Sequence, residues 1–594
     1  MANSPLRNRV LALLPACALV LAFTQAPAQA DGRAPDKQPT ATGHGGAVAS
    51  LDPYAAQAGL DVLEGGGNAV DAAVAASAML GLTRPYDGSI GGGGFMQIYS
   101  AETGEVTTID SRERAGSDVQ PDHFLDPETG EVLPFEERRV SGLSIGVPGL
   151  VRGWERALEV YGTMPMHRVL TPAINTGLRG FVVDEQYHSR TESNLERLRD
   201  FTSSRETFLV DGEAPEVGTI FRNPELAQTY RLLAREGADA FYEGELAEAI
   251  ADTVTDPPVV PETDRTVRPG EMTVDDLTDY TAEEREPTMV DYRGYEVYGM
   301  GPPSSGGSTV GEALNILSNV DLGALPHEQA LHQVIESSAL AFADRNAYLG
   351  DGEYVDVPLN GLLSQEFADE RAALIDDEAA LKPVDEGDPW PYDDGDGNGS
   401  AGDPGTTGTD GSTTHLTVAD DEGNVVSFTF TIESISGSGI AVPGAGFLLN
   451  NELTDFSAEP DHPANAPAGG KSPRSSMSPT IVLEDGEPIS AFGSPGGARI
   501  ITTVLQVAVN QLDFDMSLPE AIAAPRLSNT NSSGTLAEPG IPADVLAERG
   551  HDIDETGTLG NVTGVAFLPD GRMQAAAEAE RLGGGSALVV DPTD

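Results

Sequence analysis

Cysteine is almost absent from this chain of 594 residues. Its single cysteine, Cys17, lies within residues 1–30, a segment with the composition of an export signal. Once that segment is removed, the chain contains no cysteine. Disulfide bonds, a thiol nucleophile and thiolate metal ligands are therefore excluded together.

Long apolar runs are also lacking. The run Val10–Phe23 is broken by a proline, and neither it nor any later segment reaches the roughly 20 residues that a membrane helix needs. Arg7 and Arg9 precede the run, and a small-x-small pattern follows at 28–30, as in a signal peptide. We therefore expect residues 1–30 to be a signal peptide, and the mature protein to be secreted, extracellular or periplasmic, without a membrane span.

Positive charge is scarce. The chain has 34 Lys and Arg residues against 95 Asp and Glu, a formal net charge of −61. Nucleic acid is excluded as a partner, because binding phosphates needs clustered positive charge. The acidic residues are spread along the chain, and two interpretations stay open: a strongly solvated surface, or adaptation to a salty medium that screens self-repulsion.

Helical periodicity dominates the first half of the chain. Gly65 offers a C-terminal stop for the first helix, and Asn68 offers an N-cap for a second, nearly all-apolar one. The predicted helices are Pro53–Leu63, Asn68–Leu80, Val151–Tyr161, Asp239–Val254, Val310–Ser318 and Glu328–Tyr348.

Composition changes over residues 393–412, where Asp, Gly, Ser and Thr supply most positions. Such a stretch cannot bury apolar area, so we expect a flexible, exposed linker. Strands follow at once, and Thr413 is predicted to open the first. Alternation around short polar turns predicts two hairpins, with strands His415–Ala419 and Val425–Ile432, then Thr480–Leu483 and Pro488–Phe492.

Two short motifs match known sites only in part. Gly142–Gly146 fits the G-x-S-x-G nucleophile elbow, but it follows the charged run Glu136–Arg139 instead of an apolar strand. Asp394–Gly399 fits the first half of an EF-hand loop, but Gly405 stands where the bidentate glutamate belongs. We therefore expect that Gly142–Gly146 is no nucleophile elbow. We expect Asp394–Gly399 to be part of a solvated linker, with a weak calcium site as the alternative.

Several longer motifs follow one another in a fixed order. Before the linker these are Gly65–Ala72, Gly91–Met96, Asp110–Glu113 and Pro302–Gly307; after it they are Thr413–Asp420, Asn450–Phe456, Ser475–Thr480 and Gly493–Gly497. In this order, and over essentially the whole mature chain, they resemble the γ-glutamyltransferase (γ-glutamyltranspeptidase) family of N-terminal-nucleophile hydrolases.

The resemblance implies an α+β fold, the four-layer αββα sandwich of these hydrolases. It also implies an autocatalytic cut, in which the Thr413 hydroxyl attacks the carbonyl of Ser412. The products are a large subunit, 31–412, and a small subunit, 413–594, which form a heterodimer with one catalytic domain. No cofactor or metal is required.

Elementary chemistry supports Thr413 as the nucleophile. A threonine hydroxyl needs a base to take its proton, and the cut gives Thr413 a free α-amino group whose unperturbed pKa is roughly 7.7–8.0. By resemblance, Thr431 hydrogen-bonds the nucleophile and tunes it. Gly496 and Gly497 match the pair of backbone N–H donors that stabilise the oxyanion.

The substrate end of the site is inferred from charged and hydroxyl residues. Arg112 matches the arginine that grips the α-carboxylate of the glutamyl group, since a guanidinium offers the fork geometry that a carboxylate needs. Two of the residues that match ammonium-binding positions, Glu433 and Glu452, differ from many relatives, which carry neutral amides there. The remaining matches are Asp455, Glu452 and Glu433 for the α-ammonium group, and Ser475 and Ser476 for the α-carboxylate.

The expected reaction is transfer of a γ-glutamyl group from glutathione or a related donor to water, an amino acid or a peptide. Three alternatives stay open: a cephalosporin (glutaryl) acylase, a poly-γ-glutamate depolymerase, and an uncleaved, non-catalytic homologue. Arg112, Asp455 and the Ser475–Ser476 pair argue against a pocket that ignores the α-amino acid headgroup. Intact Thr413 argues against a non-catalytic protein.

The mouth of the site differs from that of many relatives, in which a longer segment after the equivalent of Asp455 covers the bound glutamyl group with an aromatic side chain. Here the segment Phe456–Arg474 is rich in Pro, Ala and Gly and has no aromatic residue beyond Phe456. A short loop of this kind has little area to lay over a ligand. We therefore expect an open cleft that admits longer γ-glutamyl substrates.

Overall fold

The computed structural model describes most of the chain. The described residues are 1, 35–376, 379–381, 383–393 and 411–593. The predicted signal peptide, apart from residue 1, and the Asp394–Gly399 motif lie outside them. Among the described residues, no helix combines the length and the apolar character that crossing a membrane requires.

One 13-stranded antiparallel sheet forms the centre of the molecule. Its strands, in spatial order, are β6 (Glu283–Arg285), β3 (Glu105–Ser111), β2 (Gly93–Ser100), β10 (Val425–Ser434), β9 (Gly411–Asp420), β1 (Thr40–Ser50), β17 (Met573–Ala577), β16 (Thr563–Phe567), β12 (Glu487–Gly493), β11 (Thr480–Glu484), β8 (Tyr295–Gly299) and β7 (Thr288–Tyr292), with β18 (Ser586–Pro592) also paired to β1.

The sheet folds over into two layers that face each other. Strands β10 and β12, β9 and β16, and β2 and β11 are in contact although they are not hydrogen-bonded neighbours. A cluster of mostly small apolar side chains fills the space between the layers, with Ala47, Tyr99, Ile481 and Val565 among its members. The small size of most of these residues lets the two layers approach closely.

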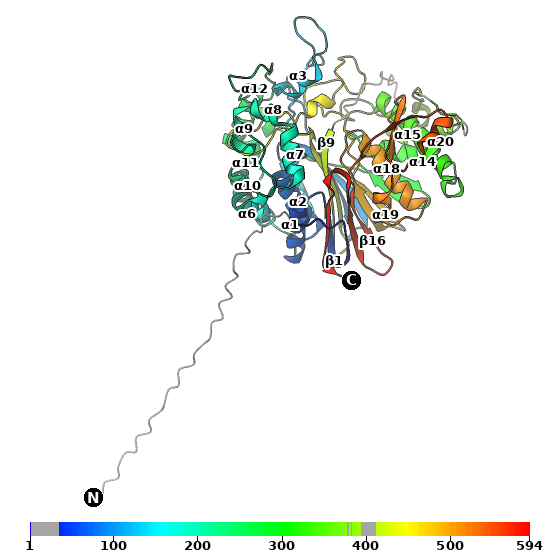
Figure 1. Cartoon of the computed structure of the whole chain (residues 1–594), viewed down its shortest axis with the longest axis horizontal. Helices are drawn as coiled ribbons and strands as arrows, with labels where there is room; N and C mark the ends of the chain where they lie inside the picture. Colours follow the sequence, from blue (N-terminus) through cyan, green and yellow to red (C-terminus); the bar gives the residue numbers. More distant parts are fainter. Residues whose placement is uncertain (2–34, 377–378, 382, 394–410, 594) are drawn as a thin grey trace.

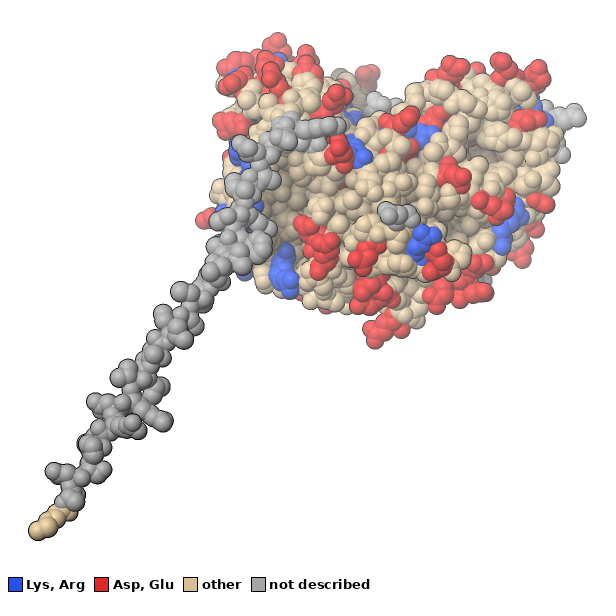
Figure 2. Space-filling view, turned by 60° about the horizontal axis from the view of Figure 1, so that its bottom comes forward, with Lys and Arg blue, Asp and Glu red and all other residues tan. Residues whose placement is uncertain are grey.

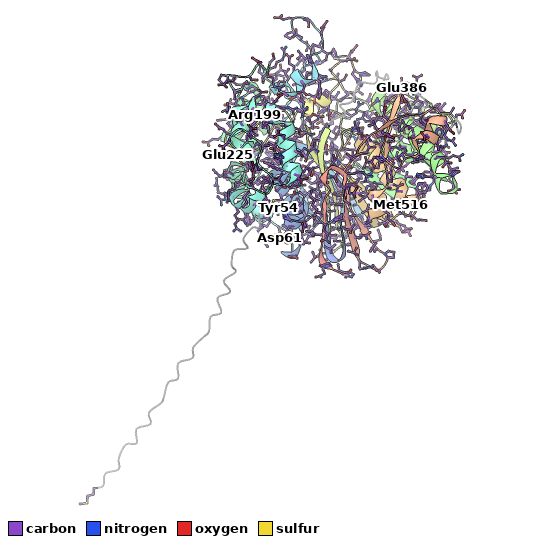
Figure 3. All side chains as sticks on the ribbon, in the orientation of Figure 1. Tyr54, Asp61, Arg199, Glu225, Glu386 and Met516 are labelled. Atoms are coloured by element: carbon purple, nitrogen blue, oxygen red, sulfur yellow. The ribbon has the colours of Figure 1, made fainter. Side chains whose placement is uncertain are left out.

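Helices cover both outer faces of this folded sheet (Figure 1). Helices α1 (Pro53–Glu64), α2 (Ala69–Thr83) and α4 (Leu150–Val160) pack on the layer that contains β9 and β10. On the other layer lie α14 (Gly306–Leu317), α15 (His327–Tyr348), α18 (Arg499–Leu512) and α19 (Leu518–Ala523). The side chains of Tyr54 on α1 and Met516 beyond α18 lie on opposite sides of the strands (Figure 3). This arrangement confirms the predicted four-layer αββα sandwich.

Strand alternation decides which side chains enter the site. On β10, Phe428 and Phe430 pack against the helices, whereas Thr429 and Thr431 point the other way, toward the space between the layers. The β9 sequence follows the same rule, since Leu416 joins the helix-side core. Because successive side chains of a strand alternate between faces, the polar residues between these apolar ones meet between the two layers.

Most predicted helices are present with similar bounds, and Asn68 caps α2 as expected. The predicted single helix Asp239–Val254 is wrong: it is two helices, α11 (Asp239–Tyr242) and α12 (Gly244–Thr255). Glu243 between them is extended and Gly244 has a φ of 68°, a left-handed conformation that interrupts a helix and favours glycine.

The strand predicted to open at Thr413 begins earlier, at Gly411, which pairs with Ser434 of β10. Ser412 is therefore part of a buried strand, and the expectation of an exposed linker fails at its last two residues. The cause is β10, whose unpaired edge beyond Thr431 accepts two more residues of the continuous chain.

The surface is strongly acidic. Figure 2 shows Asp and Glu side chains spread over one face of the molecule, with few Lys and Arg among them. This distribution agrees with the spread of acidic residues along the sequence.

Candidate active site

Thr413 and Thr431 lie directly opposite each other on the paired strands β9 and β10. The Thr413 hydroxyl donates a hydrogen bond to Oγ1 of Thr431 at 3.3 Å, and the Thr431 hydroxyl donates to the carbonyl oxygen of Ser412 at 2.6 Å. The backbone N–H of Glu433 also donates to Oγ1 of Thr431, at 2.8 Å. In the continuous chain, one hydroxyl thus bridges the predicted nucleophile and the carbonyl that precedes it.

Ser412 has a second anchor. Its hydroxyl donates to the carboxylate of Asp87, which is 4% exposed and lies in the loop between α2 and β2. Arg190 approaches the same carboxylate at 3.8 Å. Sequence reasoning missed Asp87, because it stands in a turn-like Tyr-Asp-Gly-Ser stretch that no spacing links to Ser412.

His415 lies one inward-facing position beyond Thr413 and is fully buried. Its Nδ1 lies 2.7 Å from Oγ1 of Thr429, and its Nε2 lies 3.1 Å from Oγ1 of Thr417. Burial lowers the pKa of His415 to about 3, so the ring is neutral at physiological pH. It therefore fills the space beside the nucleophile as a hydrogen-bonded spacer and carries no charge into the site.

The Gly496–Gly497 turn follows the end of β12, which crosses β9. A Cβ atom at Gly493 would overlap the ring of His415, so the backbone of β12 approaches β9 closely there. Gly496 and Gly497 have φ values of 139° and 59°. Both values lie in the region that favours glycine, and the role of the two N–H groups as oxyanion donors stays a prediction.

Arg112 is at the centre of a charged cluster. It lies just after β3, is 1% exposed, and pairs with Glu452 and, at 2.7 Å, with Oδ2 of Asp455. Glu452 and Asp455 both belong to the short helix η4 (Glu452–Asp455). The Asp455 side chain is 30% exposed whereas that of Glu452 is 1% exposed, so solvent reaches the cluster from the Asp455 side.

Two further carboxyl groups, those of Glu113 and Glu433, crowd this guanidinium or its partners. Burial raises the pKa of Glu113, which lies 3.9 Å from Arg112, to about 7. Burial and the nearby Asp455 raise the pKa of Glu433 to about 7, and burial raises the pKa of Glu452 well above its usual range. Arg112 alone faces three of these acids, Glu113, Glu452 and Asp455, so a bound ammonium group would find carboxylate partners here.

Ser475 and Ser476 directly follow Arg474, whose backbone carbonyl accepts a hydrogen bond from Arg112. The Ser475 hydroxyl accepts from the N–H of Met477 at 3.1 Å, which leaves its own proton free to donate. The Ser476 hydroxyl accepts from Nη2 of Arg345 at 2.7 Å. The structure therefore brings both predicted serines to the Arg112 end of the site.

Arg345 and Glu113 are additions to the predicted set. Arg345 lies on α15, is 2% exposed, and donates to the hydroxyls of Ser305 and Ser476. Burial lowers its pKa well below the usual value. Glu113 is the last residue of the Asp110–Glu113 motif, so the motif contained the signal; nothing in the sequence around Arg345 indicates its partner.

The segment Phe456–Arg474 is held by contacts within itself and by hydrogen bonds to Ala115 and Asp351. Phe456 is turned inward, 3% exposed, and packs in a small cluster with Phe124 and Leu453. The ammonium group of Lys471 donates to the carbonyls of Ala464 and Ala466 at 2.9 and 3.0 Å. The single aromatic side chain of this segment is thus used for packing.

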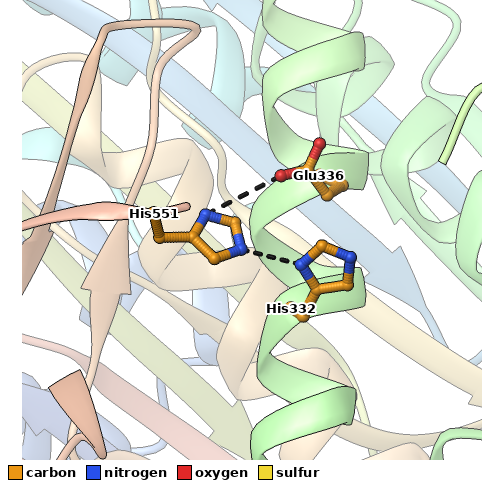
Figure 4. A group of neighbouring side chains, drawn as sticks. All are labelled: His332, Glu336 and His551. Carbon is orange, nitrogen blue, oxygen red and sulfur yellow. Dashed lines mark hydrogen bonds and ion pairs between the residues drawn. The ribbon is translucent and has the colours of Figure 1, made fainter. Parts of the chain in front are cut away.

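A second buried polar cluster joins α15 to the loop before β15 (Asp552–Glu555). Figure 4 shows His551 between His332 and Glu336. The ring nitrogens of His332 and His551 are 2.7 Å apart, and Nδ1 of His551 lies 3.7 Å from Glu336. Two ligands of one zinc ion, at about 2.0–2.1 Å each in a tetrahedron, lie well over 3 Å apart. The cluster is therefore arranged as a hydrogen-bonded chain that ties the two segments together.

The G-x-S-x-G match at Gly142–Gly146 forms no nucleophile elbow. Gly142–Ser144 is a short 3₁₀ helix, and the buried Ser144 hydroxyl donates to the carbonyls of Arg139 and Ser141. A hydroxyl occupied in this way is not presented to a substrate.

Known proteins match this chain over most of its length. A family model described as gamma-glutamyltranspeptidase matches residues 55–588. The chain is 40% identical to the glutathione hydrolase proenzyme of Bacillus subtilis strain 168, covering 91% of each chain. It is 38% identical to that of Escherichia coli K12, covering 90% of each. It is also 35% identical to the acylase ACY 1 proenzyme of Pseudomonas sp. strain SE83, covering 91% of this chain and 93% of that one.

Two solved structures resemble the fold, one over nearly the whole chain and one over about half of it. A cephalosporin acylase from Bacillus halodurans superposes with a TM-score of 0.82 at 29% identity, covering 93% of this chain and 97% of that one. A gamma-glutamyltranspeptidase from Helicobacter pylori gives a TM-score of 0.51 at 34% identity, covering 55% of this chain and 90% of that one.

Proposed function

Because this chain belongs to the gamma-glutamyltranspeptidase family, we propose that it is a self-processing glutathione hydrolase and γ-glutamyltransferase. It cleaves the γ-glutamyl amide bond of glutathione and related compounds, and passes the glutamyl group to water, an amino acid or a peptide. The observation that carries the proposal is the buried Arg112, flanked by Glu452 and Asp455. A free α-amino acid headgroup carries both charges that such a cluster recognises.

Maturation begins at the hydrogen-bonded chain from Thr413 through Thr431 to Ser412. Oγ1 of Thr413 attacks the carbonyl carbon of Ser412, and Thr431 is positioned to receive the proton of Thr413 and to donate its own to the developing oxyanion. The C–N bond then breaks as the Thr413 nitrogen takes up the proton from the former carbonyl oxygen. This leaves an ester and a free amine, and water hydrolyses the ester. The products are residues up to Ser412 and a second chain that begins with the free amine of Thr413.

Catalysis then uses the new chain terminus. The Thr413 α-amine, with an unperturbed pKa of roughly 7.7–8.0, takes the proton of its own hydroxyl. The hydroxyl attacks the γ-carbonyl carbon, and the N–H groups of Gly496 and Gly497 stabilise the oxyanion. The amine leaves with the transferred proton, and water or an amine acceptor attacks the resulting ester. The loss of one such backbone donor typically costs about a hundred- to a thousandfold in rate.

Substrate selection follows from the charged end of the site. Arg112, with the hydroxyls of Ser475 and Ser476, holds the α-carboxylate of the glutamyl group. Glu433, Glu452 and Asp455 hold its α-ammonium group. Binding replaces part of the Arg112 pairing with Asp455, which is the partner open to solvent, and the incoming ammonium takes over the released carboxylate.

Secretion is part of the same proposal. Residues 1–30 act as a signal peptide with its positive start, apolar run and small-x-small cleavage pattern. Export places the enzyme where extracellular or periplasmic γ-glutamyl compounds are available to it.

A glutaryl acylase is the second candidate, favoured by the whole-chain likeness to a cephalosporin acylase. The two functions differ in one group, because a glutaryl chain lacks the α-ammonium of a glutamyl chain. The excess of carboxyl groups around Arg112 favours the substrate with that ammonium.

The deciding experiment compares two p-nitroanilides, L-γ-glutamyl and glutaryl, with and without a dipeptide acceptor. We expect rapid release of p-nitroaniline from the γ-glutamyl compound, acceleration by the acceptor, and little release from the glutaryl compound. Equal turnover of both, or preference for the glutaryl compound, contradicts the proposed function and supports the acylase.

A further inference from the structure

The loop between α2 and β2 is clamped against the strands that carry the nucleophile. A Cβ atom at Gly88 would lie 2.8 Å from the ring of Phe430 and 3.0 Å from Cγ2 of Thr414, so the loop backbone touches both β9 and β10. The N–H of Asp87 donates to the carbonyl of Arg84 at 3.0 Å, and the hydroxyl of Ser89 donates to the carbonyl of Leu448 at 2.9 Å. Asp87 is thus presented from a fixed backbone.

Ser412 is held from two directions. Thr431 binds its carbonyl oxygen at 2.6 Å, and Asp87 binds its hydroxyl. Asp87 and Ser412 are 4% and 3% exposed, so water competes little for either partner. Hydrogen bonds to an ionised group are roughly twice as strong as neutral ones, and Arg190 lies 3.8 Å from the same carboxylate.

We propose that Asp87 is a positioning residue for self-cleavage, and that it orients the scissile carbonyl by holding the Ser412 hydroxyl. This inference rests on the proposed cut between Ser412 and Thr413. With its carbonyl and its side chain both anchored, Ser412 cannot rotate its carbonyl carbon away from Oγ1 of Thr413. Attack of this kind is steeply sensitive to alignment, because the reacting atoms have to be held about 3–3.5 Å apart.

The same carboxylate also explains how the product leaves. The cut turns Ser412 into a chain terminus with a new carboxylate, which lies next to the carboxylate of Asp87. Two like charges in a buried place repel each other strongly. Asp87 therefore binds the Ser412 hydroxyl before the cut and repels the new Ser412 carboxylate afterwards. This repulsion drives the new chain end out of the site and makes room for substrate.

The test measures how fast the full-length chain becomes two chains in a cell-free translation, followed on a denaturing gel. The variants are Asp87→Ala, Asp87→Asn, Ser412→Ala and the double alanine variant. We expect each alanine change to slow the cut by roughly ten- to a hundredfold, the effect of losing one hydrogen bond to a charged group. Asp87→Asn keeps an acceptor, so its rate should lie between those of Asp87→Ala and the unchanged chain.

The double variant tests whether the two residues act through one bond. If they do, the double variant cuts no more slowly than the slower single variant, because both changes remove the same interaction. Ser427→Ala is the matched control: it removes another buried hydroxyl from β10, one that donates to the carbonyl of Phe492 at 3.2 Å. We expect this control to cut at the unchanged rate.

The outcomes separate this inference from the proposed function. Unchanged cutting by Asp87→Ala, or slowing that simply adds to that of Ser412→Ala, overturns the positioning role, while an uncut Thr413→Ala leaves the proposed function in place. Cutting of Thr413→Ala overturns the proposed function itself. If Asp87→Ala misfolds, as shown by a lowered melting temperature, Ser412→Ala still removes the same bond without changing the loop, and normal cutting by it overturns the inference.

Discussion

The two ends of the site are built from different materials. At the nucleophile end, Thr413 and Thr431 are neutral groups on neighbouring strands, placed by the register of β9 and β10. At the headgroup end, Arg112, Glu452 and Asp455 are charged groups from segments far apart in the chain, and they hold one another. Strand pairing positions the two threonines without burying a charge. At the headgroup end, buried charged groups have to compensate one another, because burying an unpaired charge is costly. Loss of one group should therefore stop chemistry at the first end and weaken binding at the second.

The largest expected effect is at the nucleophile. Thr413→Ala lacks the hydroxyl that both the cut and the reaction need, so we expect a single uncut chain without activity. A denaturing gel and release of p-nitroaniline measure both effects. Thr414→Ala is the matched control, because alternation points that side chain to the opposite face of β9, and we expect it to be cut. A cut Thr413→Ala chain contradicts self-processing by this residue.

The next effect is at the headgroup end. Arg112→Lys keeps the charge but loses the fork that binds a carboxylate through two hydrogen bonds. We expect KM for a γ-glutamyl donor to rise by roughly ten- to a hundredfold, with normal processing.

The control for that change is Arg114→Lys, two residues further along the chain, whose guanidinium makes a partly exposed pair with Glu283 at 3.8 Å and lies over the ring of Tyr280. Pairs of this kind contribute little, so we expect KM to stay the same. An unchanged KM in Arg112→Lys as well would remove Arg112 from the substrate site.

A smaller effect should follow pH. The pKa values of Glu113 and Glu433 are raised to about 7, so both carboxyls gain protons, and lose their negative charge, as pH falls through neutrality. Binding of an ammonium group should weaken in the same direction. We expect the inhibition constant of L-glutamate to increase several-fold from pH 8 to pH 6, within the limit of about tenfold per unit for one proton. Glu433→Gln should flatten this dependence, and a pH-independent constant in the unchanged enzyme contradicts the assignment.

The smallest difference is expected between substrates of different length. Because Phe456 is packed inward and the segment after it is tied to itself, we expect a γ-linked glutamate oligomer to be hydrolysed within about tenfold of the rate for glutathione, without an added acceptor. A site without a cover also excludes water less well, which favours hydrolysis. Negligible turnover of the oligomer beside rapid turnover of glutathione means that another element closes the cleft.

The sequence contained enough information for the fold and for half of the site. Alternation in the Thr413–Asp420 strand places Thr413 and His415 on one face and Leu416 on the other, as the structure has them. The ordered motifs indicated the αββα sandwich. Strand alternation is a local pattern and the motifs follow one another along the chain, so both can be recognised from the sequence alone.

The remaining part depends on contacts that no spacing encodes. Asp87 meets Ser412 across 325 positions, and Arg345 meets Ser476 across 131. The linker ends earlier than composition predicted because β10 recruits Gly411 and Ser412 as strand residues. The periodic pattern over Asp239–Val254 also failed to show the break at Glu243. The left-handed backbone of Gly244 ends the first helix there, whatever the side-chain periodicity.

The order of the strands determines what the cut does to the molecule as a whole. Strands from before and after Thr413 alternate across the sheet, and they meet at β2–β10, β9–β1, β1–β17 and β11–β8. The three largest core clusters each combine side chains from before and after Thr413, because each layer of the sheet contains strands from both parts of the chain. If the proposed cut occurs, we therefore expect the two fragments to stay one cooperative unit, whose unfolding and dissociation are the same event.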